Sequence, residues 1–457
     1  MYRLLMEALK DWKDKTGRLP LILKGARQVG KSWLLQEFGR TCFEDVVYIN
    51  FENAGNLGEI FDGVIEPQRI IDYLGAAHGR RIEPQRTLVI FDEVQEVPRA
   101  LTSLKYFAEQ APEYAICCAG SLLGVALHSG TSFPVGKVEF LSLQPLSFHE
   151  FLLANGKGAI CDFIQGGGFA KLPENLYDDL SDLLKQYFVV GGMPQAVQTW
   201  LNTRDFSKVS TVQNNILETY QNDFSKHAPA SLVPRLRYLW NSIPSQLARE
   251  NKKFVYGLIR EGARAREYED ALLWLQDSGL IRKVGCTTTG SVPLKAYEDL
   301  KAFKLYHLDI GLLARMSELS PASIIDKTGV FQEFKGALTE QFVLQELAGQ
   351  PEIHSLYYWT SKAAAEVDFV FDWHGHVVPV EAKAGMVVHA QSLKQFKMKY
   401  QPDLSIKTSL RNLDCRDGVL NLPLTLLWNL PLYLDAVFTV SRSVDTAPDQ
   451  EDEEESR

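Results

Sequence analysis

Residues 19–32, LPLILKGARQVGKS, decide the fold of the N-terminal part of the chain. The apolar start of this stretch is typical of a buried strand, and residues 25–32 match the pattern Gly-x-x-x-x-Gly-Lys-Ser/Thr. In that pattern backbone N–H groups fold around phosphate oxygens, and the N-terminus of the following helix favours an anion. We therefore predict a nucleotide-binding loop in which Lys31 reaches the β- and γ-phosphates and the Ser32 hydroxyl binds Mg²⁺. The residues expected to contact the nucleotide are Gly25, Ala26, Arg27, Gln28, Val29, Gly30, Lys31, Ser32 and Trp33.

Four more short apolar runs follow the loop, and amphipathic helical stretches such as 99–110 separate them. The runs occupy residues 46–52, 87–93, 114–121 and 137–143. Buried strands that alternate with helices indicate a three-layer α/β domain built around a parallel sheet. We expect this domain to end near Asn155, where two glycine-rich loops begin.

Two acidic residues, Asp92 and Glu93, lie where the run 87–93 leaves the core. An aspartate at that place holds Mg²⁺, and the next glutamate polarises a water for attack on the γ-phosphate. The same pair alone is also typical of an ordinary exposed strand end, so this interpretation depends on the nearby phosphate loop. Ser121 follows the next strand, where we expect it to sense the γ-phosphate; a plain Gly-Ser turn is the alternative. ATP and Mg²⁺ are the cofactors that these residues predict.

Composition excludes several classes of protein and leaves the partner open. Of 457 residues, 46% are apolar and 23% charged, which excludes a largely disordered, collagenous or coiled-coil chain. The net charge is −9, but residues 444–457 hold seven acids and one arginine, so the rest of the chain is nearly neutral. Six cysteines without a Cys-x-x-Cys pair favour a reducing compartment, and we expect a soluble, cytoplasmic protein. The apolar stretch 422–438 is broken by Pro423 and Pro431, so we expect two buried strands there and no membrane span.

The remaining chain is first helical and then mixed. Residues 176–225 have a helical pattern, interrupted at 191–194 by GGMP, which must end one helix and redirect the next. From about 234 to 308 the order is helix, turn, helix and short β-like runs, which suits a winged-helix module. A helix at 331–348, three strands and a helix at 390–399 then predict an α+β domain.

Acidic residues and a lysine are spaced along two of those last strands. Glu366 and Asp368 share one face of a strand, and Glu381 and Lys383 share a face of the next, because side chains alternate with period two. If the faces adjoin, such carboxylates hold a divalent metal against a phosphodiester, and a lysine steadies the attacking water. Glu340, on the helix 331–348, supplies a further oxygen. A solvated strand face with cross-strand Asp/Lys pairs is the alternative.

Taken together, these motifs resemble the bacterial and archaeal AAA-superfamily ATPases that carry a C-terminal domain of unknown function similar to restriction-type nucleases. The stretches that carry the resemblance are LKGARQVGKS, VIFDEVQ, CAGS, PLSFHEFL (145–152), YFVVGGMPQAV (187–197), KLYHLDIGLLA (304–314), and AEVDFVF followed by VPVEAKAG. The resemblance implies a RecA-like P-loop core and a PD-(D/E)xK pattern at Asp368, Glu381 and Lys383, with Glu340 as the helical acid. Members often have Gly-Arg before the fifth strand, whereas this chain has Gly136-Lys137, and a lysine cannot fork onto the γ-phosphate as an arginine does. The resemblance therefore supplies no arginine finger at that position.

The sequence predicts an α/β RecA-like ATPase sheet, a helical and winged-helix middle, and an α+β nuclease-like domain. The expected boundaries are 1–155 for the ATPase core, 156–230 for a lid-like helical segment, 231–325 for the winged helix, 326–440 for the nuclease-like domain and 441–457 for an acidic disordered tail. One hypothesis is an ATPase that acts on DNA or RNA through the last domain. The other is a nucleotide-controlled switch, in which the winged helix contacts a protein partner and the last domain only binds. Both hypotheses allow oligomers, and neither involves a membrane.

Overall fold

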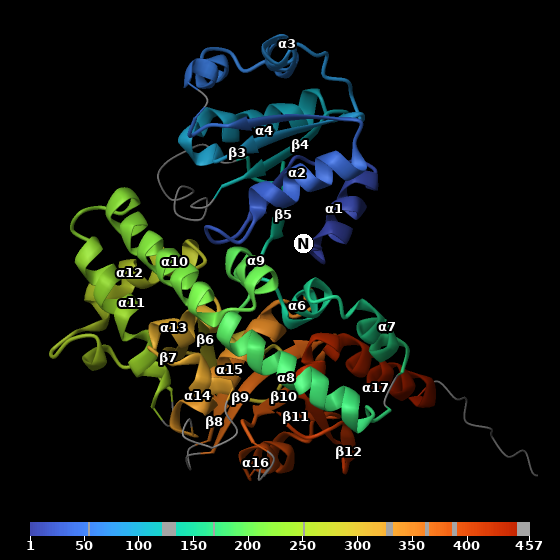
Figure 1. Cartoon of the computed structure of the whole chain (residues 1–457), viewed down its shortest axis with the longest axis vertical. Coiled ribbons are helices and arrows are strands. Elements are labelled where there is room, and N and C mark those ends of the chain that lie inside the picture. The colour runs from blue at the N-terminus through green and yellow to red at the C-terminus, as the bar shows by residue number, and fades with distance from the viewer. Residues whose placement is uncertain are drawn as a thin grey trace, which may run out of the picture. The chain divides into compact units, whose positions relative to one another are not determined.

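The computed structural model describes residues 1–53, 55–120, 134–167, 170–249, 252–325, 332–361, 365–385 and 391–445. The chain divides into two compact units. Unit 1 contains Met1–Gly156, Lys185–Lys283 and Phe303–Phe331, and unit 2 contains the remaining segments. Figure 1 colours the chain from blue at the N-terminus to red at the C-terminus.

Unit 1 is built on a sheet of five parallel strands, here called sheet A. Its strands are β1 (Leu21–Lys24), β2 (Asp45–Asn50), β3 (Thr87–Asp92), β4 (Ala115–Ala119) and β5 (Glu139–Ser142). They lie in the order β2-β3-β4-β1-β5, and every neighbouring pair is parallel. All residues of β3 and β4 are buried, as expected for strands that are covered on both faces. The predicted α/β parallel sheet is confirmed, with a strand in each of the five apolar runs.

Helices cover both faces of sheet A, which gives three layers (Figure 1). Val89 and Phe91 of β3 pack with Leu104 and Phe107 of α4 in one hydrophobic cluster. On the opposite face α2 lies so close to the sheet that a Cβ on Gly39 would stand 2.5 Å from the Val46 side chain. The helices of this part are α1 (Leu5–Asp14), α2 (Lys31–Cys42), α3 (Pro67–His78), α4 (Pro98–Gln110) and α6 (Phe148–Ala154), with 3-10 turns at Gly55–Phe61 and Val94–Glu96.

The middle of the chain is helical, as predicted. Its helices are α7 (Gly158–Gly166), α8 (Glu174–Val190), α9 (Pro194–Thr203), α10 (Phe206–His227), α11 (Val233–Leu247), α12 (Ala265–Asp277), α13 (Ile310–Met316) and α14 (Pro321–Ile325), with a 3-10 turn at Tyr256–Leu258. The break at GGMP falls between α8 and α9, where Gly191 has a φ of 71° and Pro194 opens α9. After α11 and α12 come two strands, β6 (Ile281–Thr287) and β7 (Glu298–His307). The helix, helix, strand, strand order agrees with the prediction, and the winged-helix assignment itself stays a prediction.

A mixed eight-stranded sheet, sheet B, contains these two strands and the strands of unit 2. The other strands are β8 (Tyr357–Thr360), β9 (Glu366–Trp373), β10 (His376–Ala382), β11 (Ser405–Ser409), β12 (Asp414–Arg416) and β13 (Val419–Pro423). Their order is β12-β13-β11-β10-β9-β8-β6-β7. The helices of this part are α15 (Gln332–Ala348), α16 (Gln391–Tyr400) and α17 (Leu430–Asp445), with 3-10 turns at Leu294–Tyr297 and Leu424–Asn429.

One prediction about secondary structure is wrong. The stretch 422–438 holds the end of β13, a 3-10 turn and the start of α17, where two strands were expected. Pro431 is tolerated in the first turn of a helix, because the N–H that it lacks has no intrahelical partner there. The leucines of this stretch favour a helix more than β-branched residues would. None of the helices in the described part of the chain is long and apolar enough to cross a membrane.

Candidate nucleotide-binding site

The nucleotide loop joins the end of β1 to the first turn of α2, which begins at Lys31. Gly25, Gln28 and Gly30 have positive φ values of 148°, 67° and 96°. A Cβ on Gly25 would lie 2.3 Å from the carbonyl oxygen of Leu143, so no larger residue fits there. Residues with positive φ placed among right-handed ones favour the concave turns in which backbone N–H groups bind an anion.

Lys31 is buried under its own loop. Its Nζ donates hydrogen bonds to the carbonyl oxygens of Gly25, at 2.9 Å, and Ala26, at 2.8 Å. Burial lowers the pKa of Lys31 to about 8, although Glu93 and Asp92 act in the opposite direction. A cation that is held in a desolvated loop attracts a phosphate more strongly than one in water.

The two acids of the second motif lie at the end of β3. Asp92 is buried, and its Oδ1 accepts a hydrogen bond from the Glu93 N–H at 3.0 Å. Glu93 has a φ of 49°, and its Oε2 accepts a hydrogen bond from Gln95 Nε2 at 2.6 Å. This left-handed residue redirects the chain as the strand ends, so the carboxylate of Glu93 comes from a loop and that of Asp92 from the core.

Tyr48, on the neighbouring strand β2, lies beside the two predicted Mg²⁺ ligands. Its hydroxyl donates a hydrogen bond of 2.5 Å to Asp92 Oδ2, and the side chains of Ser32 and Asn50 are close enough to lower its pKa slightly. Burial, and after it the hydrogen bond to Asp92, raises the pKa of Tyr48 to about 12. Ser32 and Asp92 both lie beside the Tyr48 hydroxyl, so these two hard oxygen ligands are near each other, and the donor set fits Mg²⁺. The sequence did not mark Tyr48, because an aromatic residue in a strand is normally a packing residue.

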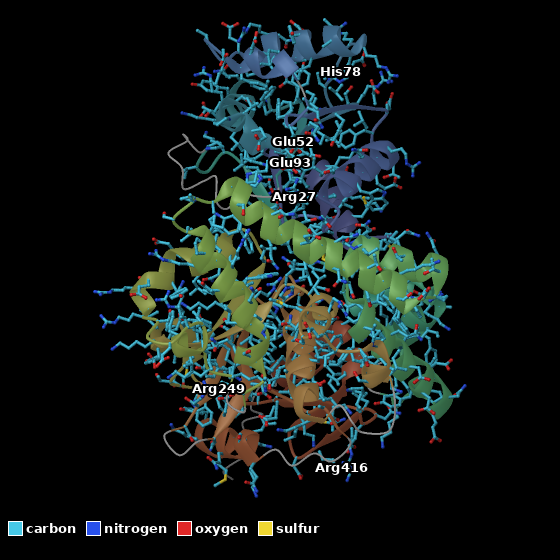
Figure 2. The ribbon with its side chains drawn as sticks, turned by 60° about the vertical axis from the view of Figure 1, so that its left-hand side comes forward. Arg27, Glu52, His78, Glu93, Arg249 and Arg416 are labelled. Carbon is cyan, nitrogen blue, oxygen red and sulfur yellow. The ribbon has the colours of Figure 1, made fainter. Side chains whose placement is uncertain are left out.

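Helix α10 contacts the loop and the segment that follows β2. Arg27 forms an ion pair with Asp223, and Lys226 pairs with Glu52 at 3.2 Å. Figure 2 labels Arg27 and Glu52, one partner of each pair, and Glu93 near them. The helical segment therefore contacts Arg27, one of the residues predicted to touch the nucleotide.

Three sequence stretches without chemistry of their own meet behind the loop. In PLSFHEFL, Ser147 and Glu150 form a capping box at the start of α6, and Glu150 also accepts a hydrogen bond from buried Arg3 at 3.0 Å. In GGMP, a Cβ on Gly192 would lie 2.1 Å from the carbonyl oxygen of Leu146. In KLYHLDIG, Asp309 caps α13 and accepts a hydrogen bond from the Gly192 N–H at 2.7 Å.

The remaining predicted residues differ in where they lie. Ser121 falls outside the described residues. Trp33 is 46% exposed and lines a groove between α2 and β2 with Phe43 and Tyr48. Lys137, which stands where the resembling family often has arginine, forms a surface ion pair with Glu109 of α4 at 3.0 Å. The charge of Lys137 is therefore paired with an acid of its own domain.

The C-terminal acids and lysine come together in unit 2. Lys383 Nζ lies 2.6 Å from Glu381 Oε1, and Asp368 Oδ2 accepts a hydrogen bond from the Ala382 N–H at 2.9 Å. Burial lowers the pKa of Lys383, but Glu381, followed by Asp368 and Glu340, outweighs burial and raises it. All four side chains are therefore close enough to interact. In the part of the chain that the structure describes, however, no group of three or more His, Cys, Asp or Glu side chains could hold a metal ion.

Comparisons with known proteins agree with the fold of sheet A. A family model described as an AAA domain matches residues 17–152. This part of the chain is therefore similar to AAA domains. Two models of domains of unknown function match residues 181–323 (DUF8612) and 335–427 (DUF4143). No curated protein matches the chain significantly.

Solved structures show only a distant likeness. The Walker-type ATPase PABY2304 of Pyrococcus abyssi is 16% identical, over 68% of this chain and 94% of its own, with a TM-score of 0.43. The ORC1 protein of Aeropyrum pernix, solved in complex with DNA, is 13% identical over 69% of this chain and 90% of its own, with a TM-score of 0.28. AMPPCP-bound DnaA of Aquifex aeolicus is 13% identical over 59% of this chain and 75% of its own, with a TM-score of 0.27.

Proposed function

We propose that the chain is a Mg²⁺-dependent ATPase. The observation that carries this proposal is the convergence of Lys31, Ser32 and Asp92 at the carboxyl ends of β1 and β3, with the Tyr48 hydroxyl hydrogen-bonded to Asp92. Ser32 and Asp92 would hold Mg²⁺, which neutralises charge on the phosphates when it is bound. Lys31 binds the β- and γ-phosphates by exchanging its two carbonyl partners for phosphate oxygens.

Glu93 is proposed to act on the attacking water. It directly follows Asp92, and Gln95 orients one of its carboxylate oxygens. A carboxylate at this place accepts a proton from a water that is in line with the γ-phosphate. The proposed metal ligand, Asp92, is the last residue of the buried strand β3, and the proposed base, Glu93, is the first residue of the loop that follows it.

Two substitutions test the ATPase. Lys31→Ala removes the cation of the loop and should abolish ATP binding, whereas Glu93→Gln keeps the size of the side chain and should bind ATP but hydrolyse it slowly. Isothermal titration and phosphate release measure the two effects. Glu96→Gln, three residues further on and exposed, is the control and should turn over normally. Full turnover by Glu93→Gln would assign the water to another residue.

For the last domain we propose action on nucleic acid through Glu340, Asp368, Glu381 and Lys383. Their proximity supports it, but the four do not form a metal-holding group, so we derive no metal-dependent step for them. The test is cleavage of DNA and RNA by the full chain in Mg²⁺, in Mn²⁺ and in EDTA. Asp368→Asn should abolish cleavage, while Asp372→Asn, on the same strand and exposed, should not. No cleavage by the wild-type chain would contradict the proposal.

A nucleotide-controlled switch is the second candidate function. The contacts of α10 with Arg27 and Glu52 favour it, because they connect the nucleotide loop to the helical segment. In that function the winged-helix-like part, expected at 231–325, contacts a protein partner, and the last domain binds without catalysis. Partner binding that changes between ATP and ADP, together with absent nuclease activity, would select the switch.

A further inference from the structure

Two carbonyl groups of the nucleotide loop are held by side chains from outside the motif. The Val29 carbonyl accepts a hydrogen bond from Arg3 Nη1 at 2.9 Å, and the Arg27 carbonyl accepts one from the Tyr220 hydroxyl at 2.8 Å. By contrast, the carbonyls of Gly25 and Ala26 accept hydrogen bonds from Lys31. The carbonyls of the loop are thus divided between the lysine and these two side chains.

The direction of a carbonyl fixes the direction of the next N–H. The peptide unit is planar and trans, so the C=O of one residue and the N–H of the next point in opposite directions. When Arg3 holds the Val29 carbonyl, the Gly30 N–H points away from Arg3. When Tyr220 holds the Arg27 carbonyl, the Gln28 N–H points away from Tyr220.

We propose that Arg3 and Tyr220 are positioning residues that aim the Gly30 and Gln28 N–H groups at the phosphates of the nucleotide. The inference rests on the proposed ATPase function and names residues that set its phosphate affinity. Donors that are aimed before the anion arrives cost no reorganisation when it binds. Without the two hydrogen bonds, a peptide unit can rotate and turn its carbonyl oxygen toward the phosphate. The negative end of the carbonyl dipole then repels the phosphate.

Arg3 is itself rigidly held, as a positioning residue must be. Its side chain is 4% exposed, and its guanidinium also donates to Glu150 Oε1 at 3.0 Å and to the Gln144 carbonyl at 2.5 Å. The capping box of α6 fixes Glu150 in turn, since its Oε2 accepts the Ser147 N–H at 3.0 Å. The stretch PLSFHEFL thereby acquires a role: it anchors the arginine that holds the loop.

Tyr220 approaches the loop from the other side, on α10. Its side chain is fully buried, and its ring meets the ring of Trp240 edge-on, with centroids 6.2 Å apart. One turn further along the same helix, Asp223 pairs with the Arg27 side chain. Because the ring fills its place whether or not the hydroxyl is present, Tyr220→Phe removes one hydrogen bond and little else.

The test measures pyrophosphate affinity of the full chain without metal, in EDTA, by isothermal titration. Pyrophosphate probes the N–H groups of the loop without the base and the ribose. A neutral hydrogen bond contributes about 0.5–1.5 kcal/mol, so Tyr220→Phe should weaken the affinity for pyrophosphate about twofold to twelvefold. Arg3→Lys, which keeps the charge but loses the fork, should weaken it at least as much.

Tyr187→Phe is the matched control. The Tyr187 hydroxyl is equally buried and donates to a backbone carbonyl, that of Leu146, at 2.5 Å, but that carbonyl lies outside the loop. Both tyrosine variants should lose similar thermal stability, and only Tyr220→Phe should lose pyrophosphate affinity. Wild-type affinity in Tyr220→Phe, or an equal loss in Tyr187→Phe, would overturn the inference. A wild-type chain that binds neither pyrophosphate nor ATP would instead overturn the proposed ATPase itself.

Discussion

Replacing Glu150 with glutamine removes the charge that faces the buried guanidinium of Arg3. Both partners are nearly inaccessible, with side-chain exposures of 4% for Arg3 and 5% for Glu150. Three donors converge on the carboxylate: Arg3 Nε at 3.0 Å and the Leu4 N–H at 2.7 Å on Oε1, and the Ser147 N–H at 3.0 Å on Oε2. A glutamine must turn its NH₂ toward one of these donors, so the variant loses an acceptor as well as the charge.

The expected loss is large for a single substitution. Breaking one partner of a buried ion pair costs about 3–5 kcal/mol of the free energy of unfolding. A domain of roughly 250 residues loses about 2 °C of melting temperature per kcal/mol, so Glu150→Gln should melt about 6–10 °C below wild type. Differential scanning fluorimetry of the full chain, read at its first transition, measures the shift.

The control for this substitution is Glu7→Gln, which breaks the exposed pair between Glu7 and Lys10 on α1. An exposed pair is screened by water, and the melting temperature of this variant should stay nearly unchanged. If Glu150→Gln also melts within a degree of wild type, the pair with Arg3 does not hold the N-terminus to the loop, and our account of PLSFHEFL is wrong.

Two further predictions concern the nucleotide site. Lys31 is charged below its pKa of about 8, so the affinity for metal-free ADP should be constant up to that pH and should fall above it, by at most about tenfold per pH unit. Isothermal titration from pH 7 to 9.5 measures this affinity. An affinity that does not change over this range would show that the charge of Lys31 does not control ADP binding. Tyr48→Phe removes the hydroxyl that occupies Asp92 Oδ2, and ATP should then bind at a Mg²⁺ concentration about twofold to tenfold lower, because the ion no longer competes with a hydrogen bond. Titration of ATP at fixed Mg²⁺ levels measures the shift, with Tyr73→Phe, an exposed tyrosine, as the control; a variant that needs more Mg²⁺ would show that Tyr48 supports Asp92 instead.

The sequence predicted the nucleotide loop and the ends of β1 and β3 because local chemistry encodes them. A buried strand, two glycines with positive φ and a lysine at a helix start lie within fourteen consecutive residues. Asp92 follows its own buried strand in the same way. The helical spacing of apolar residues was likewise enough to predict the helices on either side of GGMP.

The residues that support the site could not be found in this way. Arg3 and Tyr220 are 26 and 193 residues from the carbonyls that they bind, and no local pattern connects them. Tyr48 has the sequence context of an ordinary packing residue in a strand. In the stretch 422–438, local apolarity is compatible with both strand and helix, and tertiary packing decides between them. The strands β11 and β12, SIKTS and DCR, were missed because they contain no apolar run that marks a strand.

The contacts of α10 with the nucleotide loop impose a thermodynamic symmetry on the chain. Tyr220 and Asp223 bind Arg27 through its carbonyl and its guanidinium, so a change in the loop on nucleotide binding changes what holds the helix. Linkage is reciprocal: whatever factor the nucleotide applies to the affinity of a ligand bound through α10, that ligand applies to the affinity of the nucleotide. A partner that binds this helix would therefore change the affinity of the chain for its nucleotide by that same factor.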